Sequence, residues 1–564
     1  MSHTSARHRR QSQRTRRATP RVEQLEHRWL LSGYNFTPVA ILGNPAPGLQ
    51  GGTFADDFEA GGLNNSGQVA FVADLAASQG NKIGEGVFLG GQGGLSQVIR
   101  AGEPAPGGGT FLSSEELGAF SPIAINNSGA VAFAFLLDPF TPPYGNNAGV
   151  YRSNPVTQQV TAVVVPGVTP VPGGAPGATF AGAFFWTYLN DTGTMTFTGT
   201  VPATVGFEAP LGQGVFEAAP DGQLSKIVAP GDTVANIGTF DQANEASNNS
   251  KGDVAFAGHL TSDPSTIPVG FTSGVYLQQA PKGQIISIAH HGDPIPATAG
   301  GGVLDYAFGP IVNDSGRVAF VGAVQNTTSP PFQQDTQLVF LYSRGSLTAV
   351  ASPGQPMPGG GHLVTASAFE GQADLNNGGA VVFSALLDTG EEGLYVYAHG
   401  SLSLVAKTGT VIPGVGTIAA LDFFNLGEPS SFARINNRGQ VAFGATLVGG
   451  GGALLLATPG GTGNSDVAAV SSALTAPTPA ANGVATSLLV SGGQSTSRQA
   501  GTNTASRGAN SGSVFTGWTV EVRPQQVTTS LATAPSRWGK RPTRAPIDDL
   551  FVTLPSGLSG DPLA

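Results

Sequence analysis

A thirteen-residue phrase, repeated seven times, limits the possible folds of this chain more than any other feature of its sequence. It reads LNNSGQVAFVADL from Leu63 and returns with changes, for example as LNDTGTMTFTGTV from Leu189 and INNRGQVAFGATL from Ile435. The glycines of the seven copies are Gly67, Gly129, Gly193, Gly252, Gly316, Gly379 and Gly439. They are spaced by 62, 64, 59, 64, 63 and 60 residues, with a mean of 62. A period of this length predicts a repeat architecture.

Each copy of the phrase predicts a tight turn followed by a buried strand. Asn, Asp and Gly tolerate positive φ, and Asn or Asp side chains bond to the nearby backbone, so Asn-Asn-Ser-Gly favours a hairpin turn. In the following GQVAFVADL, Val69 and Phe71 point to one face while Ala70 and Val72 point to the other. A strand that is apolar on both faces belongs to a sheet packed between two other sheets.

The remainder of each repeat predicts three further strands. One precedes the turn, one contains GVF or GVY, as at Gly86 and Gly149, and one runs into a Pro/Gly loop, as in QLSKIVAPG from Gln223. We name the four strands A (before the turn), B, C and D in chain order. Four-stranded units in tandem are typical of propeller blades.

The two ends of the repeat region distinguish a closed ring from an open solenoid. The region opens at Thr37 with TPVAILGNPAPG, a D strand without its A, B and C strands. It closes with FARINNRGQVAFGATL and GALLLATPGG, which supply A, B and C strands without a D strand. An open solenoid needs end caps and gains nothing from this shifted frame. In a ring, the N-terminal strand completes the last blade, so residues 34–458 are predicted to form an all-β, seven-bladed β-propeller.

Two parts of the sequence resemble known bacterial proteins. The repeats resemble tandem NxxG…VAF repeats of secreted or surface proteins of unknown function, a likeness that covers most of residues 34–458 and brings no catalytic residue. Residues 1–33 are Arg-rich and then read VEQLEHRWLLS, similar to the sorting tag VE-x-LE-x-R-x-LLS of large extracellular proteins in one lineage of budding bacteria. This resemblance implies an extracellular or cell-surface location. The alternative is a disordered basic arm that binds nucleic acid.

Charge and composition narrow the expected partners. Residues 34–458 hold 11 basic and 29 acidic residues, a net charge of 11 − 29 = −18, which repels nucleic-acid backbones. The chain has no Cys, which excludes disulfides, zinc–thiolate sites and Cys nucleophiles. The apolar patch from Trp29 to Leu31 is too short for a membrane span. We therefore expect a monomer that binds no nucleic acid and does not cross a membrane.

The C-terminal region departs from the repeat. From Pro459 onward Gly, Ser, Thr, Ala and Pro dominate, so residues 459–512 are predicted to be a flexible linker. Residues 513–564 are predicted to be a mostly disordered tail, without an apolar run long enough for a membrane anchor.

The variable loops suggest where a ligand binds. The A–B turns are nearly identical, whereas the B–C connections that begin at Asp138, Val201, Thr261 and Gln325 differ widely. Because rigid scaffolds usually present function on variable loops, ligand contacts are expected on the face that carries the B–C and D–A loops. The predicted function is a binding or structural module at the cell surface that contacts an envelope component, a glycan or a protein.

Catalysis is the alternative hypothesis. We find no nucleophile elbow, metalloprotease helix or phosphate-binding loop, and we expect no catalytic residue and no cofactor apart from calcium. The alternative is a polysaccharide-directed enzyme with carboxylates at the channel mouth. Its candidates are the pairs Asp56-Asp57, Glu115-Glu116 and Glu391-Glu392. Adjacent residues of a strand point to opposite faces, which favours surface charge for these pairs.

The Pro/Gly loops carry the candidate metal ligands. Glu103, Asp232 and Asp293 each follow the first glycine of such a loop, and carboxylates from several blades could hold calcium through oxygen ligands. The alternative is a set of independent, solvated loop acids. His290 and His291 form the one His pair of the repeat region and raise the hypothesis of a transition-metal site. The alternative there is a polar strand end.

Overall fold

A computed structural model describes most of the repeat region. The described residues are 33–78, 80–91, 93–112, 123–138, 147–204, 211–263, 272–281, 283–297, 301–324, 336–366, 373–421 and 433–460. Within these ranges the regular secondary structure is all β, and no helix has the length and apolarity needed to cross a membrane. Apart from residues 33, 459 and 460, the predicted tag, linker and tail lie outside the described residues.

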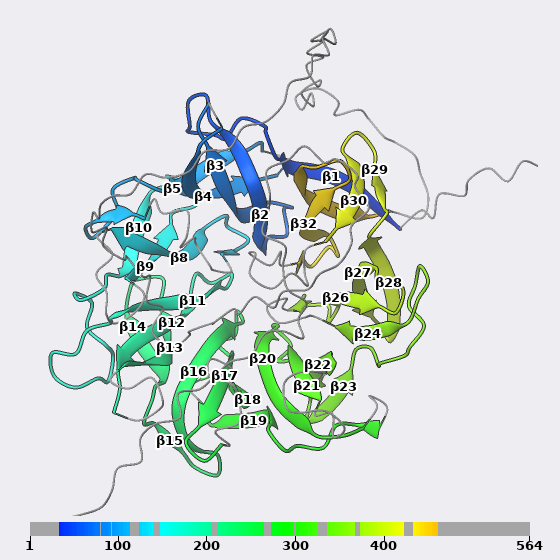
Figure 1. Cartoon of the computed structure of the whole chain (residues 1–564). Helices are drawn as coiled ribbons and strands as arrows, with labels where there is room; N and C mark the ends of the chain where they lie inside the picture. Colours follow the sequence, from blue (N-terminus) through cyan, green and yellow to red (C-terminus); the bar gives the residue numbers. More distant parts are fainter. Residues whose placement is uncertain are drawn as a thin grey trace, which may run out of the picture.

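The described strands form seven small antiparallel sheets arranged as blades around a central axis (Figure 1). This arrangement confirms the predicted seven-bladed β-propeller. Blade I contains β2 (Thr53–Leu63), β3 (Val69–Ala76), β4 (Lys82–Gly90) and β5 (Ser96–Arg100). Blade II contains β6 (Thr110–Phe111), β7 (Ala124–Ile125), β8 (Val131–Asp138), β9 (Ala148–Ser153) and β10 (Val160–Val164). Blade III contains β11 (Gly182–Leu189), β12 (Met195–Pro202), β13 (Leu211–Ala218) and β14 (Leu224–Val228).

The remaining blades continue around the ring. Blade IV contains β15 (Thr233–Val234), β16 (Gly238–Asn248), β17 (Val254–Leu260), β18 (Gly274–Gln278) and β19 (Ile285–His290). Blade V contains β20 (Leu304–Val312), β21 (Val318–Val324), β22 (Thr336–Ser343) and β23 (Ser346–Ala349). Blade VI contains β24 (Leu363–Ala366), β25 (Asp374–Leu375), β26 (Val381–Leu387), β27 (Glu392–Ala398) and β28 (Ser401–Lys407). Blade VII contains β29 (Val411–Ile412), β30 (Gly416–Ala420), β31 (Arg434–Ile435), β32 (Val441–Leu447), β33 (Gly452–Pro459) and β1 (Tyr34–Ile41).

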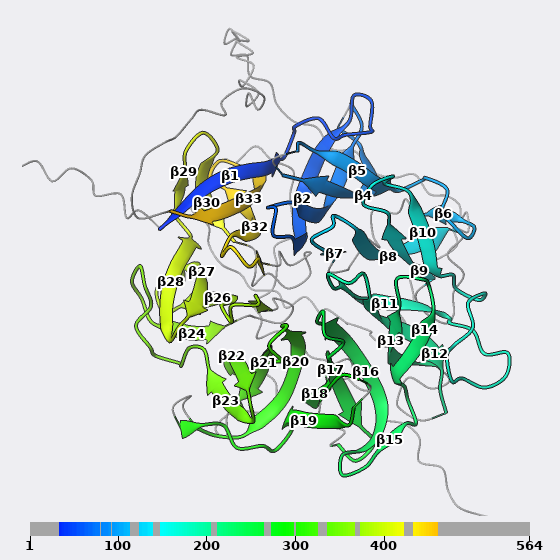
Figure 2. The same cartoon turned by 180° about the vertical axis from the view of Figure 1, so that it is seen from behind.

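Blade VII combines the two ends of the ring. Strand β1 pairs antiparallel with β33, from Tyr34 opposite Pro459 to Ile41 opposite Ala453. In Figure 2 the blue β1 accordingly lies beside the yellow and gold strands of the last blade. Ala40 is buried, and Phe36 meets Phe443 edge-on at a ring distance of 6.3 Å. The N-terminal strand therefore supplies the missing D strand, as the shifted repeat frame predicts.

The repeated VAF and GVF/GVY phrases meet inside the blades. In six blades the Phe of strand B stacks beside the Phe or Tyr of strand C, with ring centroids 5.5–6.0 Å apart. Phe71 with Phe88 and Phe256 with Tyr276 are examples, and all four rings are buried. Aromatic pairs contribute about 0.5–1.5 kcal/mol beyond their buried area. The periodic aromatic residues are thus the cores of the blades.

The A strands are less regular than the repeat predicts. In blades II, VI and VII the described part of strand A consists of two short pieces, such as β6 and β7, which pair with different ends of strand B. The residues between these pieces lie outside the described ranges. In each of these blades the piece of strand A next to the repeated turn, such as β7, keeps its pairing with strand B.

Candidate functional site at the mouth of the central channel

The first Asn of each repeated phrase holds its own turn. In blade I, Asn64 Oδ1 accepts hydrogen bonds from the backbone N–H groups of Ser66 and Gln68, both at 3.0 Å. Gly67 has φ of 81°, which explains why glycine stands there. Asn64 is only 3% exposed, and its side chain pairs these part-buried backbone donors.

The same Asn side chains also link the blades into a closed ring. Each Nδ2 donates a hydrogen bond to the backbone oxygen of the matching Asn in the next blade, at 2.8–3.3 Å. The last of these bonds, from Asn436 to Asn64, closes the circle at 2.9 Å. We call these seven buried residues the inner asparagine ring; they are Asn64, Asn126, Asn190, Asn249, Asn313, Asn376 and Asn436.

The residues that follow form a second, more exposed ring, which we call the rim. Its members are Asn65, Asn127, Asp191, Ser250, Asp314, Asn377 and Asn437. At six junctions the side-chain oxygen of one rim residue accepts a hydrogen bond from the backbone N–H of the preceding rim residue, at 2.7–2.9 Å. Among the described contacts the Asp191–Ser250 junction lacks this bond, because the short serine side chain replaces Asn or Asp.

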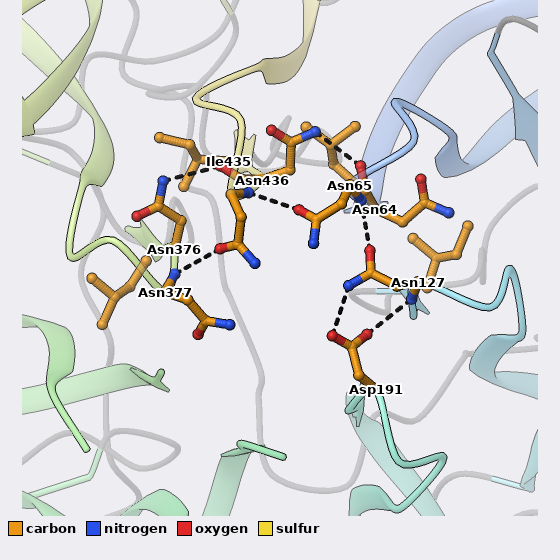
Figure 3. Close-up of a pocket in the computed structure, with 12 residues that line it drawn as sticks. Asn64, Asn65, Asn127, Asp191, Asn376, Asn377, Ile435 and Asn436 are labelled. Atoms are coloured by element: carbon orange, nitrogen blue, oxygen red, sulfur yellow. Dashed lines mark hydrogen bonds between the residues drawn. The ribbon is translucent and has the colours of Figure 1, made fainter. Parts of the chain in front are cut away.

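Members of both rings from blades I, II, III, VI and VII line a small open cavity at the channel mouth, which we call the cup (Figure 3). Its volume is about 120 Å³. The residues that precede the inner asparagines in four blades also contribute to its wall; they are Leu63, Ile125, Leu375 and Ile435. Asp191 is its one lining carboxylate, and the amides of Asn127 and Asn377 donate to Asp191 and Asp314, each at 2.6 Å. The Nδ2 atoms of Asn65 and Asn437 are not bonded to any acceptor in the described protein, so they face solvent as donors.

Charged residues cross the channel next to the cup. Arg434 of blade VII donates from Nε to the backbone oxygen of Gly61 at 2.7 Å and extends from Nη1 toward the Tyr188 hydroxyl of blade III at 3.5 Å. Asp374 accepts from the backbone N–H of Ile435 at 2.8 Å. Burial raises the pKa of Asp374, while Arg434 opposes that shift, and burial also raises the pKa of Tyr188. These side chains occupy the axis beneath the cup.

The predicted calcium ligands each serve their own loop. Glu103 Oε2 accepts from the Arg100 N–H at 3.1 Å, and Asp293 Oδ2 accepts from the His290 N–H at 2.8 Å. Asp232 does the same for Ala229 at 2.8 Å and also bonds Lys226 at 2.7 Å. The three residues lie on loops of different blades. No group of three or more His, Asp or Glu side chains suited to a metal ion occurs among the described residues.

Calcium binding by these three carboxylates remains a prediction. If oxygen sites form there, millimolar calcium should stabilise the native protein by roughly 2.7 kcal/mol at a hundredfold excess over the dissociation constant. The measurement is a calcium titration of the melting temperature, for the native chain and for a Glu103→Gln, Asp232→Asn, Asp293→Asn variant. The amides keep an oxygen that can accept the loop hydrogen bonds. Equal shifts in both proteins would show charge screening and remove the metal hypothesis.

The histidine pair is divided between two networks. His290 Nε2 lies 3.0 Å from Asp263, whereas His291 Nδ1 lies 2.7 Å from the backbone oxygen of Asp305. The hydrogen bond to Asp263 raises the pKa of His290 above its usual value. The pKa of Asp263 is lowered. Burial alone would raise it, but hydrogen bonds from His290 and Ser273 outweigh burial. Both histidines are engaged at the strand end, as expected for the polar alternative.

The other predicted positions are only partly described. Glu391 forms an ion pair with Lys407 at 2.9 Å, and Glu392 accepts from the backbone N–H of Leu421 at 2.8 Å, so this carboxylate pair serves two different partners. The pair Glu115-Glu116 lies outside the described residues, as does much of each variable B–C connection. The side chains of Asp56-Asp57 are also not described. Ligand binding by the B–C and D–A loops therefore stays a prediction.

The sequence analysis placed ligand contacts on the variable-loop face, because the A–B turns are nearly identical. It therefore did not predict a site at the rim. The available signal was the polar second position of every phrase, which recurs with the 62-residue period. What could not be read from one repeat is that seven such positions converge on one mouth.

The chain matches a known protein-family model in two regions. Family of unknown function (DUF7453) matches residues 29–241 and again residues 233–454. The chain belongs to the DUF7453 family. The two matched regions follow one another and together span the ring of this DUF7453 propeller. The sequence matches no curated protein.

Several solved propeller-containing structures are distantly similar to the DUF7453 chain. The β-propeller domain of the trilobed protease from Pyrococcus furiosus is 10% identical, with 72% of this chain and 97% of that chain covered and a TM-score of 0.39. Pyrococcus horikoshii acylaminoacyl peptidase is 13% identical with the same TM-score; the match covers 72% of this chain but only 51% of the peptidase. XC5397 of Xanthomonas campestris, described as a gluconolactonase, is 13% identical over 60% of this chain and 85% of its own, with a TM-score of 0.30. Similarity at these identities and TM-scores says nothing about the activity of the DUF7453 chain.

Proposed function

We propose that this propeller is an exported binding module that recognises a hydroxyl-rich ligand, such as the end of an envelope glycan, in the cup. The observation that carries the proposal is the group of polar side chains that line one open cavity. The solvent-facing amides of Asn65 and Asn437 are donors and the Asp191 carboxylate is an acceptor. Donors and acceptors placed together match the hydroxyl groups of a sugar.

The dimensions of the cup define how much of a ligand it takes. A volume of about 120 Å³ is small compared with the roughly 300–1,000 Å³ of ordinary ligand pockets. The cup therefore accommodates one terminal unit that projects outward, rather than an internal stretch of chain. Asp191 and the solvent-facing amides of Asn65 and Asn437 are the polar groups placed to contact it.

Rigidity of the cup favours binding. The inner asparagine ring and the rim fix the amide positions from both sides, so little side-chain freedom is lost when a ligand enters. The charge of −18 on residues 34–458 disfavours acidic ligands and is compatible with neutral glycans. The N-terminal resemblance to a sorting tag supports the exported location.

The test compares the two faces of the propeller. Full-length protein is titrated calorimetrically with neutral monosaccharides and short glycans, and an Asp191→Ser, Asn437→Ser variant is titrated with any that bind. Blade IV already carries Ser250 at the equivalent position, so these substitutions respect the turn. Loss of two ligand hydrogen bonds at about 1 kcal/mol each should weaken binding roughly 30-fold. Glu103→Gln, on the opposite face, is the matched control and should leave affinity unchanged.

Two results would contradict the proposal. One is the absence of binding to every neutral glycan tested. The other is a binding constant that is unaffected at the rim but lost when a B–C loop is replaced, which would place recognition on the loop face instead. Cell fractionation tests the location, because a purely cytoplasmic protein would remove the export hypothesis.

A further inference from the structure

The interface between blades III and IV is built from polar side chains. Strand β12 presents Thr196, Thr198 and Thr200 on one face, at positions where β8 of blade II has Ala132, Ala134 and Leu136. We call the interface of β12 and β13 with β16 the polar seam. Its residues are more than nine-tenths buried; they are Thr196, Thr198, Thr200, Gln213, Gln242 and Asn244.

Contacts show which side chains face each other across the polar seam. Thr196 Oγ1 donates to the backbone oxygen of Ala246 at 3.3 Å. Further along, Gln242 and Asn244 of β16 donate to the single oxygen Gln213 Oε1 of β13, at 3.2 and 3.1 Å. These bonds run directly between the two blades.

Three buried oxygens in the polar seam nevertheless have no partner in the described protein. They are Thr198 Oγ1, Gln242 Oε1 and Asn244 Oδ1. Asn248, at the cup end of β16, has a fourth such atom, Oδ1, while its Nδ2 bonds the backbone oxygen of Thr194. An unsatisfied buried acceptor costs about 1–3 kcal/mol, so a row of them demands donors from another source.

Reassigning the amide orientations does not remove this demand. If Gln213 were turned over, its Nε2 would replace the shared acceptor, and Gln242 and Asn244 would have to turn as well. Their Nε2 and Nδ2 groups would then be the atoms without partners. Either orientation leaves buried polar groups that only an added molecule can satisfy.

The neighbouring junction of blades IV and V is packed differently. There Tyr306 and Phe308 hold the positions of Gln242 and Asn244, in the same register with strand B. The buried amides are therefore particular to the polar seam.

We propose that the polar seam is a binding site for internal water, with molecules that donate to Thr198, Gln242 and Asn244 and extend toward Asn248 beside the A–B turn. The polar seam lies between blades III and IV, whereas no residue of blade IV lines the cup. Water fits this chemistry because the unpartnered atoms are neutral oxygens and water can donate two hydrogen bonds to them.

The test is a crystal structure of the full chain at about 1.5 Å, with the amides of β16 and β20 compared by hydrogen exchange in solution. We expect at least two ordered waters at about 2.7–3.2 Å from these oxygens. We also expect exchange of the β16 amides to slow at least tenfold in Thr198→Val, which removes a water-binding oxygen and keeps both bonds to Gln213, whereas exchange in β20 should stay unchanged.

Three outcomes would overturn the proposal. The first is a dry polar seam in which the amides have found protein partners. The second is a cation with five or more oxygen ligands, identified by the anomalous signal of soaked rubidium, which would make this an ion site instead. The third is β16 exchange in Thr198→Val that is identical to exchange in the native protein.

Discussion

Deletion of residues 1–50 is expected to open the ring and to produce the largest loss of stability of any change considered. It removes β1, whose Val39 and Ala40 are buried against blade I and whose Phe36 packs on Phe443. Burial of each large apolar side chain contributes about 1.5–3 kcal/mol, so the loss exceeds about 5 kcal/mol. It also exposes the edge of β33, an aggregation-prone surface. Insolubility, or a melting temperature lowered by about 10 °C or more, should be measured by calorimetry and sedimentation.

Two further deletions separate the effect of β1 from that of the segments outside the ring. Removing residues 1–33 leaves β1 intact and should preserve the melting temperature, as should removing residues 465–564. If the 1–50 deletion melts like the 465–564 deletion, closure by the N-terminal strand is wrong.

Asn313→Ala is expected to destabilise the ring by about 2–4 kcal/mol. The substitution removes the Nδ2 bond to the Asn376 oxygen at 2.9 Å and the Oδ1 acceptor for the Ser315 and Arg317 backbone N–H groups at 3.0 and 3.1 Å. Each hydrogen bond contributes about 0.5–1.5 kcal/mol, and the bond to the Asn376 oxygen is buried. Chemical denaturation measures the change in unfolding free energy.

The neighbouring Asp314→Ser is the matched control, because blade IV has Ser250 at this position. It removes two hydrogen bonds, from the Ser250 N–H and from Asn377 Nδ2, and because the second is exposed a loss below about 2 kcal/mol is expected. Asn313→Asp separates the two roles of the side chain. It keeps the acceptor but places a buried carboxylate beside the Asn376 oxygen, so its folded-state pKa is raised. The variant should therefore regain stability as pH falls through that raised pKa, because the neutral acid can donate again. Equal stability of Asn313→Ala and Asp314→Ser would show that the inner asparagine ring does not hold the blades together.

The ring was predictable because its evidence is periodic. Each phrase combines turn residues with an apolar strand, and the period of 62 gives one blade per repeat. Ring closure was predicted from the order of the strands, because the repeat region begins with a lone D strand and its last repeat has no D strand. The structure confirms this with the β1–β33 pairing. The sequence did not predict that strand A of blades II, VI and VII is divided into short pieces, each of which pairs separately with strand B.

The sequence by itself determined the blade number, the strand order and the strand that closes the ring, since these depend on local turn chemistry and alternating apolar positions. Only the tertiary structure decided what the repeated asparagines do. Within one repeat Asn64 is a turn residue; its second role, as a donor to the next blade, exists only when blades are placed side by side. The polar seam is of the same kind, because Thr198 and Asn244 come from different blades. Contacts between repeats depend on curvature and spacing, which no single repeat encodes.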